Sequence, residues 1–257
     1  MKSKENLILV HSFPTNSILL EGLIAFLDDY FKVYFIDLPG FTKKSPLDRN
    51  KVSLKFYSDY ISAEIEKLNL DKYIIGGISF GFIVVNEAKL DRKKCKAILA
   101  VEPYINNKFL HLSFLKRFLY THLLDDIFTD KFAKKVWESP HVENILRFLM
   151  GEPNNADVLL KELDYRTFFQ TAKILMNNNK NPKYRDDMPY VLWINKNDTT
   201  ISADKIIDEF LTKIKKLLVR FNDVDHYPKD MSKKYFKSKI KKQDVLESIE
   251  WINSFNV

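Results

Sequence analysis

Three residues that lie far apart in this sequence have the types that nucleophilic catalysis by a serine requires. Ser79, Asp198 and His226 follow one another in that order. A serine hydroxyl is a poor nucleophile at neutral pH because it keeps its proton. A histidine can take that proton, and a carboxylate can orient the histidine and stabilise its charged form. We therefore predict that Ser79 attacks a carbonyl carbon, that His226 is its base and that Asp198 orients His226.

Ser79 stands at the centre of residues 77–81, which read G-I-S-F-G and fit the pattern G-x-S-x-G. This pattern places a serine on a sharp turn between a buried strand and a helix, where side chains at the glycine positions would collide with the backbone. The chain has only six glycines, and Gly76, Gly77 and Gly81 fall in this one window. The plainer interpretation, a glycine turn that tolerates a serine, holds only if the pentapeptide stands alone.

The acid and the base each follow a predicted strand. Asp198 comes after the apolar run 189–194, and His226 comes after the apolar run 217–221. Open α/β sheets build their sites beyond the carboxyl ends of their strands. Three chemically matched residues at three strand ends occur by chance far less often than one pentapeptide, so the catalytic interpretation of Ser79 is favoured.

The oxyanion that forms when Ser79 attacks needs backbone N–H donors that are already in position. Phe80, the residue after the nucleophile, is one expected donor. The second is expected in the loop after the first strand, residues 11–14, and we assign it to Phe13.

Short apolar runs and helical patterns alternate along the chain, which predicts an α/β fold with a mostly parallel sheet and right-handed crossovers. The predicted strands are 7–10, 32–36, 73–75, 97–101, 189–194 and 217–221, and the predicted helices are 17–30, 53–70, 82–90, 202–216 and 243–255. Ser53 and Ser202 are predicted to cap two of these helices.

The alternation stops after Pro103, and residues 103–188 show helical patterns rich in aromatic side chains. We predict a core formed by 1–102 and 189–257 and an inserted helical cap, or lid, at 103–188. A cap over the strand ends would make an apolar pocket, which suits an acyl or aromatic group better than a sugar or a nucleotide. For 109–119, an amphipathic helix that touches a membrane surface is the second interpretation, after packing within the cap.

The motifs together resemble those of the α/β-hydrolase family, in its esterase-like branch with an inserted helical cap. The matching stretches are H-S-F-P at 11–14, D-L-P-G-F at 37–41, the turn at 77–81, N-D at 197–198 and D-H-Y-P at 225–228. Ser12 stands where the family usually has glycine. This leaves open whether the backbone at Phe13 differs from that of the family and whether the Ser12 hydroxyl points at the site.

The resemblance implies a sheet of about six strands with helices on both faces and without the family's first two strands. It also implies a serine hydrolase that cleaves a carboxylic ester or thioester with an apolar acyl group through an acyl-enzyme, without a cofactor. Two other functions fit the same residues. One is a catalytically idle protein of this fold that binds a small hydrophobic ligand, and the other is an acyltransferase.

Composition narrows the partners. The net charge of +7 comes mostly from lysine. We find no zinc-finger spacing, no Walker loop, no metal-binding histidine pair and no basic helix with stacking aromatics, so neither a metal nor nucleic acid is predicted as a partner.

The single cysteine and the absence of a signal-like or membrane-spanning run predict a cytoplasmic protein. The lysine-rich stretch 229–242 is predicted to be a solvated, partly mobile insertion, with contact to an anionic surface as the alternative. Nothing in the sequence sets the oligomeric state.

Overall fold

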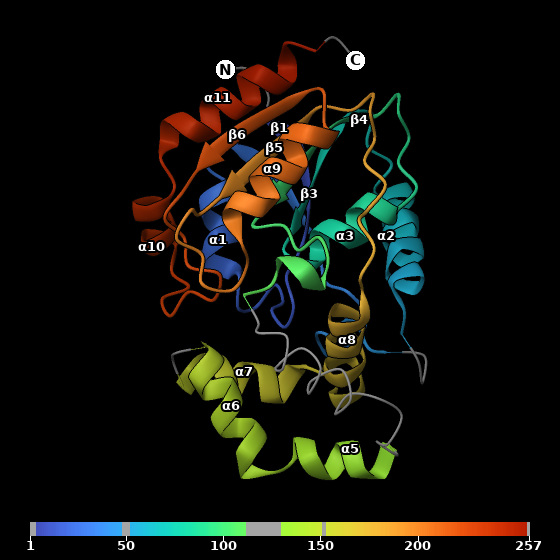
Figure 1. The fold of residues 1–257 in the computed structure, drawn as a ribbon, viewed down its shortest axis with the longest axis vertical. Coiled ribbons are helices and arrows are strands. Elements are labelled where there is room, and N and C mark those ends of the chain that lie inside the picture. The colour runs from blue at the N-terminus through green and yellow to red at the C-terminus, as the bar shows by residue number, and fades with distance from the viewer. Residues whose placement is uncertain (1–3, 48–51, 112–129, 151–152, 256–257) are drawn as a thin grey trace.

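A six-stranded sheet forms the centre of the protein in a computed structural model that describes residues 4–47, 52–111, 130–150 and 153–255. The strand order is β2-β1-β3-β4-β5-β6, and every neighbouring pair is parallel (Figure 1). The strands are β1 (Glu5–Val10), β2 (Phe31–Ile36), β3 (Tyr73–Ile78), β4 (Cys95–Val101), β5 (Tyr190–Ile194) and β6 (Leu217–Phe221). The predicted sheet is therefore confirmed, with all six strands parallel.

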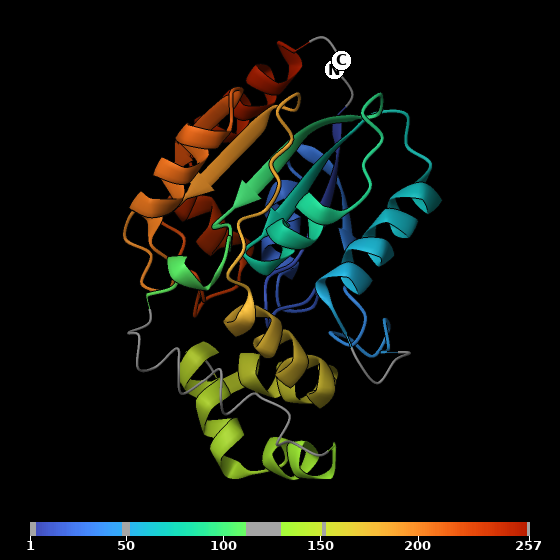
Figure 2. The same cartoon turned by 45° about the vertical axis from the view of Figure 1, so that its right-hand side comes forward.

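Helices cover both faces of the sheet (Figures 1 and 2). One face carries α2 (Leu54–Leu68), α3 (Phe80–Glu87) and α9 (Ala203–Lys213), and the other carries α1 (Glu21–Leu27), α10 (Lys233–Lys239) and α11 (Lys242–Asn253). Successive strand residues point to opposite faces, so in β1 Ile8 packs toward the first layer and Leu9 toward the second. Burial on both faces explains why the strands read as continuous apolar runs.

The two predicted serine caps have different outcomes. Ser53 caps α2, where its side chain accepts a hydrogen bond from the Phe56 amide. Ser202 stands at the N-cap position of α9, but its side chain makes no capping hydrogen bond. That helix ends at Lys213 instead of residue 216, because the backbone of Ile214 is already extended.

The lysine-rich stretch 229–242 includes α10 and the start of α11, and most of its lysines are exposed, which agrees with the predicted solvated stretch. Its partial mobility stays a prediction. Ser232 caps α10 by accepting from the Tyr235 amide, and Phe236 is 1% exposed in the apolar layer beside α1. The backbone just before α10 lies close to α1, because a Cβ on Gly22 of α1 would lie 2.0 Å from the Met231 carbonyl oxygen. The lysines of α10 and its flanks are mostly exposed, while its few apolar residues face the core.

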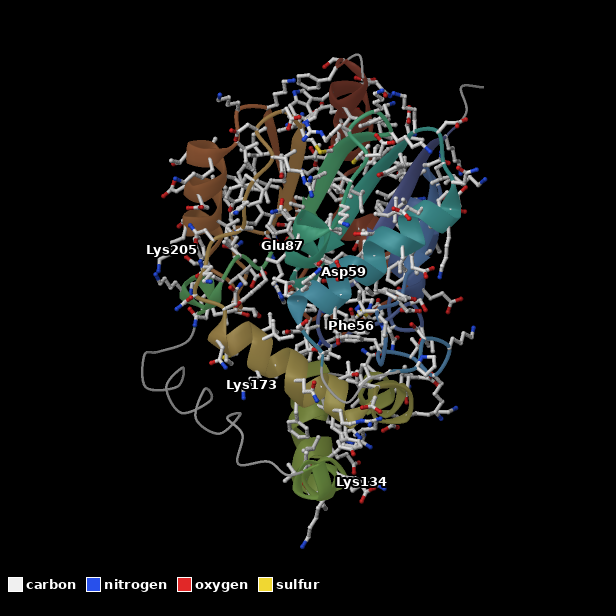
Figure 3. The ribbon with its side chains drawn as sticks, turned by 90° about the vertical axis from the view of Figure 1, so that its right-hand side faces the viewer. Phe56, Asp59, Glu87, Lys134, Lys173 and Lys205 are labelled. Carbon is white, nitrogen blue, oxygen red and sulfur yellow. The ribbon has the colours of Figure 1, made fainter. Side chains whose placement is uncertain are left out.

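Among the described residues between β4 and β5, the regular elements are helical, and these helices lie beyond the carboxyl ends of the strands (Figures 1 and 3). They are a 3-10 turn, η1 (Asn107–Phe109), followed by α5 (Asp130–Trp137), α6 (Pro140–Met150), α7 (Pro153–Glu162) and α8 (Tyr165–Asn177). Lys134 of α5 lies at the end farthest from the sheet (Figure 3). Most of the stretch 109–119, which was considered for membrane contact, lies outside the described residues.

No helix in the described parts of the chain combines the length and the apolar composition needed to cross a bilayer.

Candidate active site

A sharp turn between β3 and α3 holds Ser79. The backbone of this residue has φ 46° and ψ −112°, a region that residues with a Cβ rarely occupy, so the fold around it must hold it there. A Cβ on Gly81 would lie 2.6 Å from the His11 carbonyl oxygen, and one on Gly77 would lie 2.5 Å from the Phe82 amide nitrogen. The two glycines are needed because the backbone itself fills the space that their side chains would take.

The structure brings the three predicted residues into one hydrogen-bonded chain. His226 Nε2 lies 3.1 Å from Ser79 Oγ, and His226 Nδ1 lies 2.8 Å from Asp198 Oδ2. Both distances are those of ordinary hydrogen bonds. The side chains of His226 and Asp198 are 4% and 0% exposed, so water does not compete for their contact.

Asp198 is held in its ionised form. Burial opposes ionisation, but the hydrogen bond and charge of His226 and the amides of Ile201 and Thr200 outweigh it, so the pKa of Asp198 falls below its ordinary value. Asp198 Oδ1 accepts from the Thr200 amide at 2.6 Å and from the Ile201 amide at 2.9 Å. A carboxylate at Oδ2 fixes the proton of His226 on Nδ1, which leaves Nε2 free to accept the proton of Ser79.

The two expected oxyanion donors belong to the turn after β3 and to the loop after β1. Phe80 is the first residue of α3, and the first amides of a helix have no acceptor within it. Phe13 follows β1, and its carbonyl accepts from the Tyr227 hydroxyl at 3.2 Å, which ties this loop to the loop that carries His226. The orientation of both amides toward a bound oxyanion stays a prediction.

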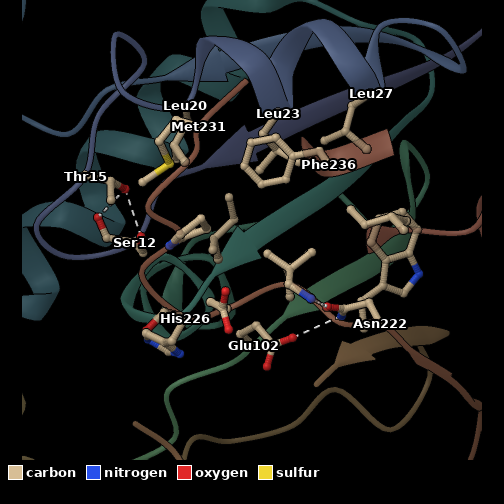
Figure 4. Close-up of a pocket in the computed structure, with 18 of the residues that line it drawn as sticks. Ser12, Thr15, Leu20, Leu23, Leu27, Glu102, Asn222, His226, Met231 and Phe236 are labelled. Carbon is tan, nitrogen blue, oxygen red and sulfur yellow. Dashed lines mark hydrogen bonds between the residues drawn. The ribbon is translucent and has the colours of Figure 1, made fainter. Parts of the chain in front are cut away.

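Ser12 lines the same cavity as Ser79 and His226. Its hydroxyl lies 2.8 Å from the Thr15 hydroxyl, within its own loop (Figure 4). Neighbouring His11 is fully buried, as expected for a structural histidine: Nδ1 lies 2.8 Å from the Ser12 carbonyl, and Nε2 accepts from the Leu38 amide at 3.0 Å. Burial lowers the pKa of His11, so a neutral ring joins the loops after β1 and β2.

Glu102 is a member of the site that the sequence predictions missed. It follows β4, is 4% exposed and has φ 43°. Its Oε1 accepts from the Asn195 amide at 2.7 Å and from Asn222 Nδ2 at 3.0 Å (Figure 4), while its buried Oε2 accepts no hydrogen bond from the described residues. One carboxyl group thus joins the start of the loop that carries Asp198 to the start of the loop that carries His226.

The pKa of Glu102 is shifted in the direction opposite to that of Asp198. Burial and the negative charge of Asp198 raise the pKa of Glu102 well above its ordinary value. Two neighbouring buried carboxyl groups rarely both ionise, so of the two Glu102 is the one that holds a proton more readily. The sequence did contain a signal for Glu102, since it is an acid that follows a predicted strand. Asp198 and His226 were predicted because they lie in loops that follow strands.

A small apolar cavity opens beside Ser79 and His226 and extends between the sheet and helices α1 and α10 (Figure 4). Its volume is about 50 Å³, and every residue that lines it belongs to 1–102 or 189–257. The sequence predicted an apolar pocket formed by residues 103–188 over the strand ends. This cavity is a different one, because its walls come from the strands, from α1 and α10 and from the loops that join them.

In the described part of the chain, no cluster of three or more histidine, cysteine, aspartate or glutamate side chains is arranged to hold a metal ion.

Comparisons with known proteins agree on the fold. The model of the alpha/beta hydrolase fold family matches residues 5–135. Pimeloyl-[acyl-carrier protein] methyl ester esterase of Wigglesworthia glossinidia brevipalpis is 24% identical over 189 residues, which cover 66% of this chain and 71% of that protein.

Two solved structures extend the likeness to nearly the whole chain. An esterase from Exiguobacterium antarcticum has a TM-score of 0.69 at 11% identity and covers 98% of this chain and 93% of its own. A thermophilic esterase from Thermogutta terrifontis has a TM-score of 0.64 at 16% identity and covers 99% and 92%. At these identities the likeness shows a shared fold.

Proposed function

The chain belongs to the alpha/beta hydrolase fold family, and on that premise we propose that it is a serine hydrolase that cleaves carboxylic esters through Ser79, His226 and Asp198. The observation that carries this proposal is the unbroken hydrogen-bonded chain from Ser79 Oγ through His226 to Asp198. The curated relative is named as an ester hydrolase and both similar structures are named as esterases, which supports the same reaction class.

The reaction follows from the geometry. Ser79 Oγ attacks the carbonyl carbon of the ester while His226 Nε2 takes the hydroxyl proton, and the amides of Phe13 and Phe80 donate to the oxyanion. When the tetrahedral intermediate collapses, His226 gives that proton to the leaving oxygen and an alcohol departs. Water then attacks the acyl-enzyme with His226 as base, which releases the acid and restores the Ser79 hydroxyl. A thioester reacts in the same way, with a thiol as the leaving group.

The helices α5 to α8 are proposed to form a cap over this site. Their contacts with the loops around the site support the proposal: the Asp164 amide donates to the Gly40 carbonyl at 2.8 Å. Aromatic side chains continue the contact, because the Phe168 ring of α8 lies 5.2 Å from that of Phe13 and 5.1 Å from that of Trp137. Apolar aromatics at the edge of the oxyanion loop favour an apolar acyl group in the substrate.

Kinetics of ester hydrolysis test this proposal. Wild type and Ser79→Ala are compared on p-nitrophenyl esters of graded acyl length and on an acyl thioester. Turnover by wild type and a loss of about 10⁴-fold or more in Ser79→Ala are expected, because removing the nucleophile leaves only the background of the site. Equal rates for the two proteins would refute the role of Ser79.

The same experiment separates the two other functions that fit these residues. A protein that only binds a hydrophobic ligand would hydrolyse none of the esters and would retain that ligand through purification. An acyltransferase would give a new ester or amide when an alcohol or an amine is added, at the expense of the free acid.

A further inference from the structure

The cavity beside Ser79 has no part in the reaction described so far, yet it begins at the reacting atoms. Ser79 and His226 line its mouth, and Leu20, Leu23 and Leu27 line one wall from α1 and the residue before it (Figure 4). Their spacing of three and four residues places the three leucines on one face of the helix. Met231 and, from α10, Phe236 line the cavity on the same side of the sheet as α1 (Figure 4).

The size of the cavity limits what it can hold. An apolar cavity of about 150 Å³ accepts benzene and stays empty of water. The cavity here has about 50 Å³, which is room for a chain of about one to three carbons by the same comparison. Ser12, Thr15 and Asn222 also line the cavity, but most of its surface is apolar, so an alkyl group is the fitting occupant.

The position of His226 decides which part of an ester lies there. The proton on Nε2 must pass to the leaving oxygen, so that oxygen lies within hydrogen-bond distance of Nε2. Asp225, His226 and Pro228, from the loop that carries the base, line the cavity. The carbon attached to the leaving oxygen therefore falls at the mouth of the cavity. An ester placed in this way has its acyl group on the other side of the reacting carbon. Phe13 and Phe168 contact each other outside the cavity and are available to that group.

We propose that this cavity is the subsite for the leaving alcohol and that it selects esters of short alcohols, with about one to three carbons. The proposal rests on the ester hydrolysis proposed above and adds which half of the ester is selected by size. Leu23 and Met231 limit the length of the alcohol, since both side chains line the cavity.

Two series of esters test the proposal on the whole chain. One series keeps the butyryl group and lengthens the alcohol from methanol to hexanol, and the other keeps the methyl ester and lengthens the acid. In the alcohol series, kcat/KM of wild type is expected to peak within the first three alcohols and to fall at least tenfold by the hexyl ester. Each methylene that enters the cavity is worth about fourfold, and a longer chain has no space there.

Variants of residues that line the cavity test whether the cavity is where the alcohol is selected by size. Leu23→Ala and Met231→Ala are expected to move the preferred alcohol one or two carbons longer and to leave the acid series unchanged. Phe168→Ala is the matched control on the acyl side, and it should change the acid series only. Leu211→Ala, at a position 62% exposed on α9, should change neither. Met231 is only partly buried, so its variant keeps the test available if Leu23→Ala fails to fold.

The outcomes separate this inference from the proposed function. A flat alcohol series, or cavity variants that change the acid series instead, would overturn the inference while hydrolysis still depends on Ser79. If no ester in either series is hydrolysed in a manner that depends on Ser79, the proposed function fails and the inference fails with it. The wild-type alcohol series needs no variant, so it decides even if every variant is unstable.

Discussion

Replacing Glu102 by alanine is expected to loosen the two loops that carry Asp198 and His226. The carboxyl oxygen Oε1 is the acceptor for the Asn195 amide and for Asn222 Nδ2, and alanine leaves both donors without it. Because Asn195 follows β5 and Asn222 follows β6, the variant removes one of the contacts that hold the two loops together; the bond from Asn195 Nδ2 to the Val224 carbonyl remains.

The size of the effect follows from those two bonds. An unpaired buried donor costs about 1–3 kcal/mol, so losing the partner of two donors lowers the free energy of unfolding by about 2–6 kcal/mol. For a chain of this size that corresponds to a fall in Tm of about 4–24 °C. A displacement of His226 by an ångström costs about 10²-fold in rate, so a fall of that order in kcat/KM is expected as well.

Glu102→Gln is the informative partner of that variant. Glutamine keeps the acceptor oxygen and resembles a protonated glutamate, so at pH 5 this variant should match wild type in Tm and in kcat/KM. The pKa of Glu102 in the fold is raised above its ordinary value of 4.5. Its contribution to stability is therefore fully present at low pH and is lost as the pH rises from 4.5 through the raised pKa. Glutamine does not ionise, so the free energy of unfolding of Glu102→Gln should rise relative to that of wild type as the pH rises to 8.

Urea unfolding followed by circular dichroism at pH 5 and pH 8, together with ester hydrolysis at both values, measures these effects. Glu87→Gln is the control, since Glu87 is an exposed glutamate at the end of α3 (Figure 3), and it should change nothing. If Glu102→Gln is as damaging as Glu102→Ala at both pH values, the site needs a charged carboxylate and the reasoning is refuted.

Two further predictions concern the turn and the acid. Gly81→Ala should lower Tm by more than about 5 °C in a thermal melt, because a Cβ there would lie 2.6 Å from the His11 carbonyl oxygen; an unchanged Tm would show that the turn has room. Asp198→Asn should lower kcat about 10⁴-fold in the ester assay, and a smaller loss than about tenfold would mean that another acid orients His226. Since the pKa of Asp198 is lowered, its stabilisation is present above pH 3.8 and is lost as the pH falls through the lowered pKa. Asp198→Asn should therefore lose less stability than wild type in urea unfolding between pH 5 and pH 3.

The sheet and the catalytic candidates were accessible from the sequence because each has a local signature. A strand buried on both faces is an unbroken apolar run, and a site at the carboxyl end of a parallel sheet collects residues that directly follow such runs. Ser79, Asp198 and His226 all follow this rule. The structure brings them together at hydrogen-bond distances.

The features that the sequence predictions missed depend on contacts between distant segments. Glu102 has the same strand-end position, but only its bonds to Asn195 and Asn222 distinguish a buried acid from a solvated one. Helix α10 was not predicted, because its sequence is mostly lysine and shows no apolar periodicity. Its one buried side chain, Phe236, is enough to pack this short helix against the core. The cavity exists because α1 and α10 pack together over the sheet, and no periodicity within either helix predicts the space left between them.

The identity of the residue that reacts with a fluorophosphonate probe tests the central claim most directly. The probe forms a covalent bond with a serine that an adjacent base activates, and mass spectrometry of the digested protein locates the adduct. We predict a single adduct on Ser79 in wild type and none in Ser79→Ala. An adduct on a different residue, or a folded wild-type protein that stays unlabelled, would contradict the claim that Ser79 is the nucleophile of a serine hydrolase.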